Sequence, residues 1–113
     1  MAAKENPDEP IVVLATAPDA EALARLGRVL VDERLAACVT VVPAVRSIYR
    51  WKDGVEEAAE ALGVVKTTAG RYGALEKRWR ELHPYEVPEL LVVRVAGGLP
   101  AYLSWLTEST RGK

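Results

Sequence analysis

The heptapeptide His83-Pro84-Tyr85-Glu86-Val87-Pro88-Glu89 holds many of the side chains in this sequence that are suited to binding a ligand. It carries the only histidine, a phenol and two carboxylates, and its two prolines stiffen the backbone that presents them. Rigid turns with several polar groups are common positions for binding sites. Two roles for His83 follow. Its cation can cap the C-terminus of a preceding helix, where the dipole favours positive charge, or its imidazole can bind a metal ion or another ligand.

Five further side chains stand out by type and position. Cys38 lies in a valine-rich segment, where it can be a small buried hydrophobe or a thiol for metal or redox chemistry. Lys66 lies six residues after Glu60, on the same face of an alternating strand, and it can extend to solvent or hold an anion. Tyr49 and Trp51 also share a face, where they can anchor subunit packing or form an aromatic platform.

Several common catalytic motifs are missing from the sequence. It has no G-x-G-x-x-G or G-x-x-x-x-G-K-[ST] segment, and no Cys-x-x-Cys or His-x-x-x-His pair. A serine–histidine triad would depend on His83, which is followed at once by Pro84. We therefore predict a protein without catalytic turnover and without an organic cofactor. One histidine and one cysteine are too few ligands for a tight metal site, so an oligomer would have to complete one.

The composition predicts one globular domain. The chain has 113 residues, of which 50% are hydrophobic and 27% charged, and its formal net charge is −1. Balanced charge argues against a nucleic-acid or membrane partner, and no apolar run is long enough to span a bilayer. We assign residues 1–10 to a flexible tail without the apolar segment of a signal peptide, and residues 11–113 to a single domain. With one cysteine and hence no intrachain disulfide, we expect a cytoplasmic protein.

Residues 36–67 read as one long β-hairpin. Asp53-Gly54 suits a type I′ turn, in which both central residues have positive φ. Residues 36–52 would extend about 55 Å as a strand, whereas a domain of this size is roughly 35 Å across, so the hairpin must bend or overhang. Pro43 lacks an N–H group and is the expected bend or bulge. Overhanging strands expose unpaired edges, which predicts an oligomer built through the hairpin.

The remaining pattern predicts two strands and three helices around this hairpin. We expect a strand at 11–15 buried on both faces, a helix from Asp19 to about 34, a helix at 71–82, a strand at 89–95 and a helix from Pro100 with residues 108–113 frayed. The side chains expected to face inward are Leu23, Leu26, Leu30, Val31, Tyr72, Leu75, Trp79, Leu82, Tyr102, Leu103 and Leu106. Gly27 indicates close packing of its helix on the sheet. The order β-α-β-β-α-β predicts an α+β, ferredoxin-like sandwich with an added C-terminal helix.

Five segments together resemble the CutA divalent-cation-tolerance family. They are Glu33-Arg34-Leu35-Ala36-Ala37-Cys38-Val39, Ser47-Ile48-Tyr49-Arg50-Trp51, Lys66-Thr67, the heptapeptide at 83–89 and Tyr102-Leu103-Ser104-Trp105-Leu106. The resemblance extends from about residue 11 to 110. It implies a tight trimer in which strands of three chains form shared sheets, similar to the PII signalling proteins. It also implies a role linked to copper and other divalent cations, with clefts between subunits.

The resemblance also implies candidate residues for such a cleft. His83 would be the metal ligand, Lys66 would hold an anion, and the other members would supply charge balance and aromatic walls: Glu60, Glu86, Glu89, Tyr49, Trp51 and Tyr85. The family member best known for copper binding has a cysteine in its first strand and two histidines before the proline. Ala15 and Leu82 replace two of these groups, so we expect weak binding of copper or another divalent metal. The alternatives are a PII-like sensor of a small anion, favoured by Lys66, Arg46 and Arg50, and a structural scaffold.

Overall fold

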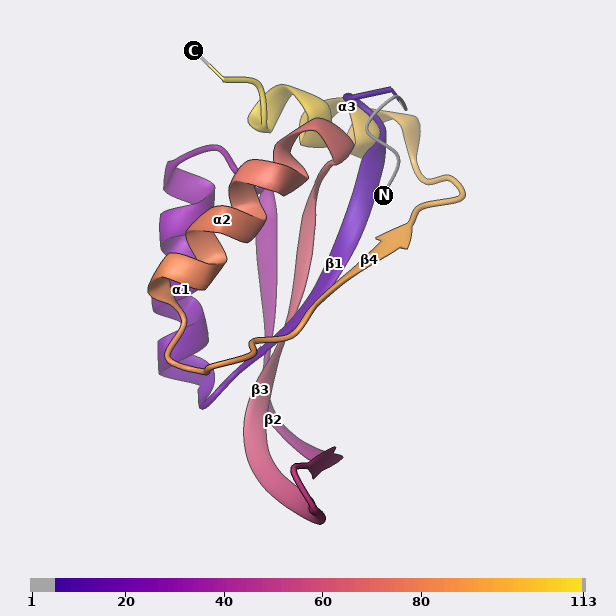
Figure 1. Ribbon diagram of the computed structural model, residues 1–113. Coiled ribbons are helices and arrows are strands. Elements are labelled where there is room, and N and C mark those ends of the chain that lie inside the picture. Colours follow the sequence, from indigo (N-terminus) through magenta and orange to yellow (C-terminus); the bar gives the residue numbers. More distant parts are fainter. Residues whose placement is uncertain (1–5, 113) are drawn as a thin grey trace.

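The computed structural model describes residues 6–112 and confirms an α+β fold with an antiparallel four-stranded sheet (Figure 1). The elements in chain order are β1 (Pro10–Ala17), α1 (Ala20–Asp32), β2 (Cys38–Trp51), β3 (Gly54–Thr68), the 3-10 helix η1 (Ala69–Arg71), α2 (Tyr72–Leu82), β4 (Leu90–Arg94) and α3 (Pro100–Ser109). The strands lie in the order β2-β3-β1-β4. This is the expected ferredoxin-like arrangement. No helix in the described range is long and apolar enough to cross a membrane.

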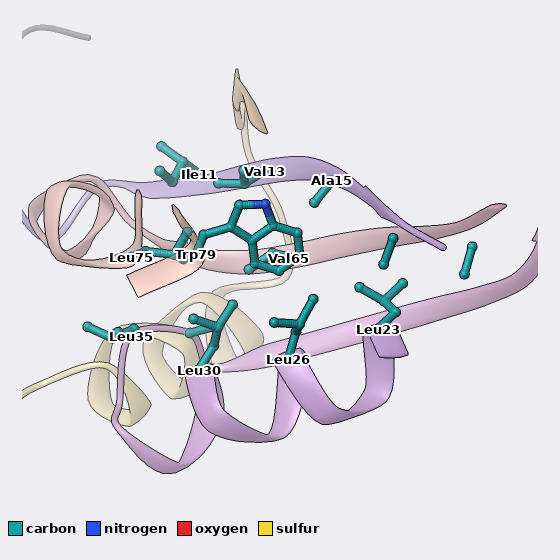
Figure 2. Close-up of a cluster of buried hydrophobic side chains, with 13 residues drawn as sticks. Ile11, Val13, Ala15, Leu23, Leu26, Leu30, Leu35, Val65, Leu75 and Trp79 are labelled. Atoms are coloured by element: carbon teal, nitrogen blue, oxygen red, sulfur yellow. The ribbon is translucent and has the colours of Figure 1, made fainter. Parts of the chain in front are cut away.

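The hydrophobic core lies between the sheet and the layer formed by α1 and α2 (Figure 2). The leucines of α1 follow the helical period, so Leu23, Leu26 and Leu30 all point toward the sheet. Trp79 of α2 is 1% exposed and is one of the largest side chains in this cluster. The core therefore fixes both helices on one face of the sheet.

The predicted cap and the predicted close packing of α1 are confirmed, but one of its predicted inward side chains is not. The Asp19 carboxylate caps the helix by accepting a hydrogen bond from the Ala22 backbone N–H at 2.8 Å. A Cβ atom at Gly27 would lie 3.1 Å from the Cβ of Val39, which explains why glycine suits this close crossing of α1 and β2. Val31 is 41% exposed, so its predicted inward position is wrong. It falls beside the leucine stripe and faces away from the sheet.

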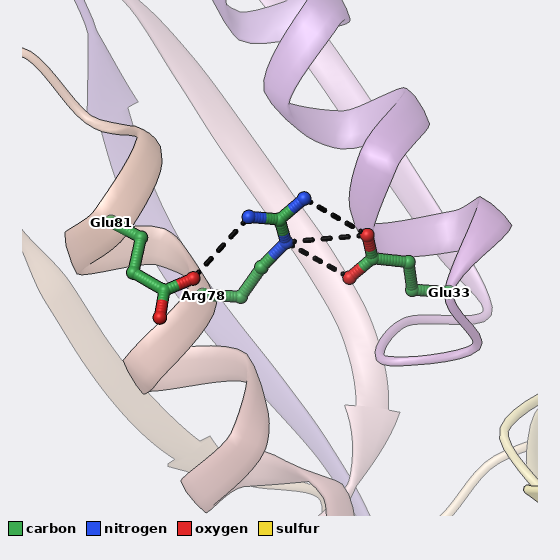
Figure 3. Close-up of polar contacts among 3 residues, drawn as sticks. All are labelled: Glu33, Arg78 and Glu81. Carbon is green, nitrogen blue, oxygen red and sulfur yellow. Dashed lines mark hydrogen bonds and ion pairs between the residues drawn. The ribbon is translucent and has the colours of Figure 1, made fainter.

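An arginine links the two core helices through charge (Figure 3). Arg78 of α2 donates from Nε and Nη2 to the carboxylate of Glu33, just after α1, at 3.0 Å each. Its Nη1 donates to Glu81 at 3.3 Å. The guanidinium plane matches the carboxylate of Glu33 in a bidentate pair, which favours one relative position of the helices. This contact lies at the surface and away from the groove described below.

The hairpin of β2 and β3 extends beyond the rest of the sheet (Figure 1), and the molecule measures 42 × 27 × 26 Å. The pairing register shifts between Val42 and Val45, so Pro43 and Ala44 together face one residue of β3. This confirms the bulge predicted at Pro43. A bulged strand bends and twists more strongly, which accounts for the curved free end of the hairpin.

The predicted turn at Asp53-Gly54 is wrong by one position. Trp51 pairs with Gly54, which places Lys52 and Asp53 at the centre of the turn. Lys52 has φ 56°, whereas no glycine in the described range has a positive φ. The side-chain pairs along both arms set the register, and Gly54 becomes the first residue of β3 instead of a turn residue.

The face of the sheet opposite α1 and α2 is only partly covered; we call it the open face. Its apolar residues include Val12, Leu14, Val42, Leu62, Val64, Leu91 and Val93. The prediction that β1 is buried on both faces is therefore wrong, because its residues alternate between buried and half-buried. β1 also continues through Ala17, beyond the predicted end of this strand at residue 15, since Ala17 pairs with Ala61 of β3.

Helix α3 packs across one end of the open face. Leu106 is buried as predicted, but Tyr102 is 41% exposed, which contradicts its predicted inward position. The predicted fraying from residue 108 is wrong at Thr110, which is buried. Its hydroxyl donates to the Leu106 carbonyl at 3.1 Å and lies 3.4 Å from the hydroxyl of Thr68.

Part of the segment predicted to be a flexible N-terminal tail belongs to the folded domain. Ala69 and Gly70 donate backbone hydrogen bonds, each 2.9 Å long, to the carbonyls of Glu9 and Pro7. Pro10 already belongs to β1. Residues 6–10 are thus attached to the domain, and residues 1–5 of the predicted tail lie outside the described range.

Candidate functional site

A groove of about 550 Å³ lies between the base of the hairpin and the loop that joins α2 to β4. Six residues proposed from the sequence line it: Tyr49, Trp51, Glu60, Tyr85, Glu86 and Glu89. The lining is completed by Thr16, Ser47, Ile48 and Val87, which were not among the predicted site residues. Their apolar and hydroxyl side chains carry no recognisable motif. Ser47 lies two residues before Tyr49 and therefore on the same face of the strand, which was the one signal in the sequence that could have added it to the predicted site.

The groove forms where three parts of the chain meet. Beyond the bulge, Val45 of β2 pairs with Glu60 of β3, and the following alternate residues place Ser47, Tyr49 and Trp51 on the same face as Glu60. The loop at 83–89 crosses beside the point where the hairpin leaves the sheet (Figure 1). Its Tyr85 reaches Glu60, which closes one side of the groove.

The groove combines a buried carboxylate with a tyrosine and a second carboxylate. Glu60 is 8% exposed, and its Oε2 accepts a hydrogen bond from the Tyr85 hydroxyl at 2.8 Å. Burial, followed by this hydrogen bond and the charge of Glu60, raises the pKa of Tyr85 to about 12. Burial, followed by the charge of Glu60, also raises the pKa of Glu89. No basic residue in the described range lines the groove, so its electrostatics favour a cation.

His83 lies under the groove and does not line it. The Tyr85 backbone N–H donates to Nδ1 at 3.1 Å, so Nε2 carries the hydrogen and donates to the Thr16 carbonyl at 2.8 Å. The imidazole is 7% exposed and packs against the rings of Trp79 and Tyr85, with centroids 5.1 and 4.6 Å away. Neither nitrogen offers a free lone pair to a metal ion in this conformation.

These contacts correct the capping role that the sequence suggested for the His83 side chain, and its role as a metal ligand stays a prediction. Its backbone ends α2 by donating to the Trp79 carbonyl at 2.9 Å, but its side chain does not cap that helix. The side chain instead joins the heptapeptide to the end of β1, 67 residues earlier in the chain. His83 therefore positions Tyr85 at the groove and is not itself presented to a ligand there.

Lys66 and Cys38 lie together at a different place on the open face. They pair across β2 and β3, and the Lys66 Nζ donates to the hydroxyl of Thr40. The Cys38 Sγ lies 3.8 Å from the same hydroxyl. Lys66 shares a face with Glu60 as predicted, but six residues along a strand separate them by about 20 Å. Lys66 is therefore not a groove residue.

The two arginines of the anion-binding alternative also lie outside the groove. Arg46 forms an exposed ion pair with Glu57 at 3.2 Å, and Arg50 is exposed on the hairpin and does not line the groove. The basic residues that would hold an anion do not converge in this chain.

The donors that could hold a metal are few. Within residues 6–112, no three His, Cys, Asp or Glu side chains are grouped closely enough to hold a metal ion. Three carboxylates line the groove, those of Glu60, Glu86 and Glu89, and only Glu60 and Glu89 influence one another electrostatically. Further ligands would therefore be waters or groups of another chain. This arrangement suits weak binding of a cation and not a closed, high-affinity centre.

The raised pKa of Glu89 predicts a pH-dependent gain of stability when its charge is removed. A carboxyl group whose pKa is higher in the folded chain stabilises the fold below its unfolded pKa, and this contribution is lost as the pH rises through the folded value. Glu89→Gln should therefore be more stable than the original protein near neutral pH, and the difference should vanish below about pH 4. Denaturant unfolding at both pH values measures it. Glu86→Gln, on the exposed part of the same loop, is the control, and an equal gain there would assign the effect to net charge.

Comparison with known proteins identifies the family. The family model described as "CutA1 divalent ion tolerance protein" matches residues 11–109. The divalent-cation tolerance protein CutA of Thermus thermophilus is 48% identical over 99 residues, which cover 88% of this chain and 96% of that protein. The solved structure of the Thermus thermophilus protein has a TM-score of 0.88 at 46% identity, covering 90% of this chain and 99% of the other. The crystal structure of CutA1 from Oryza sativa has a TM-score of 0.89 at 40% identity, covering 93% of this chain and 96% of the other. The chain therefore belongs to the CutA1 family of divalent-ion tolerance proteins.

Proposed function

We propose that this protein acts in divalent-cation tolerance as a non-catalytic homotrimer that binds a divalent cation weakly through Glu60 and Glu89. The observation that carries the proposal is the pair of carboxylates in one groove, with the pKa of Glu89 raised by burial and by the charge of Glu60. A bound cation would offset both the burial and the repulsion. Two carboxylates are fewer than the three or four ligands of a tight site, which supports weak binding.

Copper(II) is the most informative test metal. Among divalent first-row ions it binds most tightly to a given set of nitrogen and oxygen ligands, so it reveals a weak site at the lowest concentration. The carboxylates of the groove replace His83 as our proposed ligands, because both of its nitrogens already make hydrogen bonds. A role of His83 at the metal is tested in the same experiment.

The proposed trimer is supported by apolar surface that one chain leaves uncovered. Ile48 and Val55 on the hairpin are 64% and 66% exposed, and Leu91 on the open face is 58% exposed. β2 and β4 are both edge strands with unpaired backbone groups. Surfaces of this kind are typical of contacts between subunits. Light scattering should give three times the chain mass of 12.3 kDa, and a monomer at micromolar concentration would contradict the trimer.

The absence of catalysis is supported by the hydrogen bonds of the imidazole. His83 is the most suitable general base in the sequence, and its two ring nitrogens bond to backbone groups of Tyr85 and Thr16. Neither nitrogen reaches a serine or cysteine side chain in the described range, as a nucleophile–base pair would require.

The metal proposal predicts that calorimetric titration of copper(II) at neutral pH depends on the groove carboxylates. Glu60→Gln combined with Glu89→Gln should weaken binding at least about tenfold, because charged ligands are replaced by amides of the same shape. Binding to the original protein should also weaken as the pH falls through the raised pKa of Glu89. Circular dichroism checks that the variant is folded.

Two variants control this titration. Glu57→Gln removes a negative charge from the same strand, in an exposed pair with Arg46 outside the groove, and should leave binding unchanged. His83→Gln tests the histidine directly. Equal binding by the original protein and the double carboxylate variant would contradict the proposed ligands. Loss of binding only in His83→Gln, at unchanged stability, would return the site to the imidazole.

A further inference from the structure

The groove contains more than a metal site needs. Its volume of about 550 Å³ lies in the range of pockets for organic ligands, and at about 30 Å³ per water it exceeds the space of a single hydrated ion. Tyr49 and Trp51 form part of its wall and are 43% and 40% exposed. Aromatic side chains do not coordinate a metal ion held by carboxylates, so Tyr49 and Trp51 could serve a second ligand chemistry as well as subunit packing.

The most buried charged group in the groove is a carboxylate without a cationic partner. Glu60 is 8% exposed, and among the described residues its one hydrogen-bond donor is the neutral hydroxyl of Tyr85. Buried carboxylates are normally paired with a cation. Glu89 lines the same groove as Glu60. The two groups together offer hydrogen-bond acceptors to a positively charged donor.

An aromatic wall of the groove already attracts a cation from this chain. The Lys52 Nζ lies over the ring of Trp51, 5.9 Å from the ring centroid. Ammonium groups are attracted to the faces of indole and phenol rings. Lys52 belongs to the turn and is not part of the groove lining, so this contact leaves the groove carboxylates without a cationic partner.

We propose that the groove binds an organic cation, a primary ammonium group on a short apolar stem, with the ammonium on Glu60 and Glu89 and the stem against Tyr49 and Trp51. The N–H groups of a primary ammonium can donate hydrogen bonds to the carboxylate oxygens, whereas a quaternary ammonium has no N–H group to donate. This inference uses the groove of the proposed metal site but concerns a different ligand, and the two stand or fall separately.

The test uses 1-aminobutane, which is protonated at neutral pH, in buffer freed of metal ions by a chelator. Saturation-transfer and chemical-shift NMR measure its affinity, beside 1-butanol, which lacks the charge, and tetramethylammonium, which lacks N–H donors. We expect saturable binding of the amine, and binding at least about tenfold weaker for both comparison ligands. Glu60→Gln should weaken amine binding about tenfold, and Trp51→Leu a few-fold.

Glu57→Gln again serves as the matched control and should bind the amine like the original protein. Should Glu60→Gln fail to fold, Glu89→Gln gives the same test at a less buried position. Amine binding that Glu60→Gln and Glu89→Gln both lose supports the inference, whether or not copper(II) binds. If the amine binds but copper(II) does not, the metal proposal fails and this one stands.

Three outcomes would overturn the inference. Copper(II) binding through the carboxylates without any amine binding would leave the metal proposal intact and reject this one. Equal binding of 1-aminobutane and 1-butanol would show that the charge is not recognised. If Glu60→Gln weakens the oligomer and the original protein binds none of the amines, a cation of a partner subunit fills the groove.

Discussion

Trp79→Ala should lower the free energy of unfolding by about 3–5 kcal/mol, the usual cost of emptying an aromatic position in a core. Trp79 of α2 is 1% exposed and packs into the hydrophobic core between the two helices and the sheet (Figure 2). The neighbouring helices are held by short connections and cannot collapse far into the space left behind. Guanidinium unfolding at fixed protein concentration measures the change. A loss under about 1 kcal/mol would contradict the proposed role of Trp79 in the core.

Two variants sharpen the test at Trp79. The indole Nε1 is buried and has no hydrogen-bond partner in the described range, so Trp79→Phe loses packing but no hydrogen bond and should cost clearly less than alanine. Trp105→Ala changes the same residue type on α3, where the side chain is 45% exposed. It should have little effect on the fold of one chain, and any larger effect that depends on protein concentration would place Trp105 at a subunit contact.

His83→Ala should destabilise the protein by about 3–5 kcal/mol, through the loss of two buried hydrogen bonds and of packing against Trp79 and Tyr85. Removing the imidazole leaves the Tyr85 N–H and the Thr16 carbonyl without this partner. The loop at 83–89 should also become less ordered, so the variant should bind groove ligands more weakly even where it remains folded. Thermal and denaturant unfolding measure the first effect.

Conservative replacements separate this positioning role from metal binding. The amide oxygen of His83→Asn can accept from the Tyr85 N–H, and the amide nitrogen of His83→Gln can donate to the Thr16 carbonyl. Each should therefore restore part of the stability that alanine loses. Unchanged stability in His83→Ala, together with lost copper(II) binding, would contradict the positioning role and identify the histidine as a ligand.

The sequence predicted those features that depend on neighbouring residues. The Asp19 cap and the leucines of α1 follow from local hydrogen bonding and helical period. The bulge at Pro43 follows from its missing N–H. Six residues that the sequence singled out by type and position line one groove, and the resemblance to CutA proteins grouped them as one cleft. That they bind a ligand remains a prediction.

Features that depend on distant contacts were not predictable in this way. The turn at Lys52-Asp53 is fixed by pairing along two arms, and the dipeptide Asp53-Gly54 alone indicated another position. The shared face of Glu60 and Lys66 was correct, but parity along a strand carries no information about separation, and Lys66 does not line the groove that contains Glu60.

His83 shows most clearly the difference between what the sequence determined and what only the tertiary structure determined. The sequence by itself determined that one imidazole would follow α2 in a stiff turn, because Pro84 ends the helix there. Only the fold brings the Thr16 carbonyl, 67 residues away, within 2.8 Å of that ring. A ring nitrogen binds whatever partner the folded chain places beside it, so its role follows from long-range packing and not from the residues next to it in the sequence.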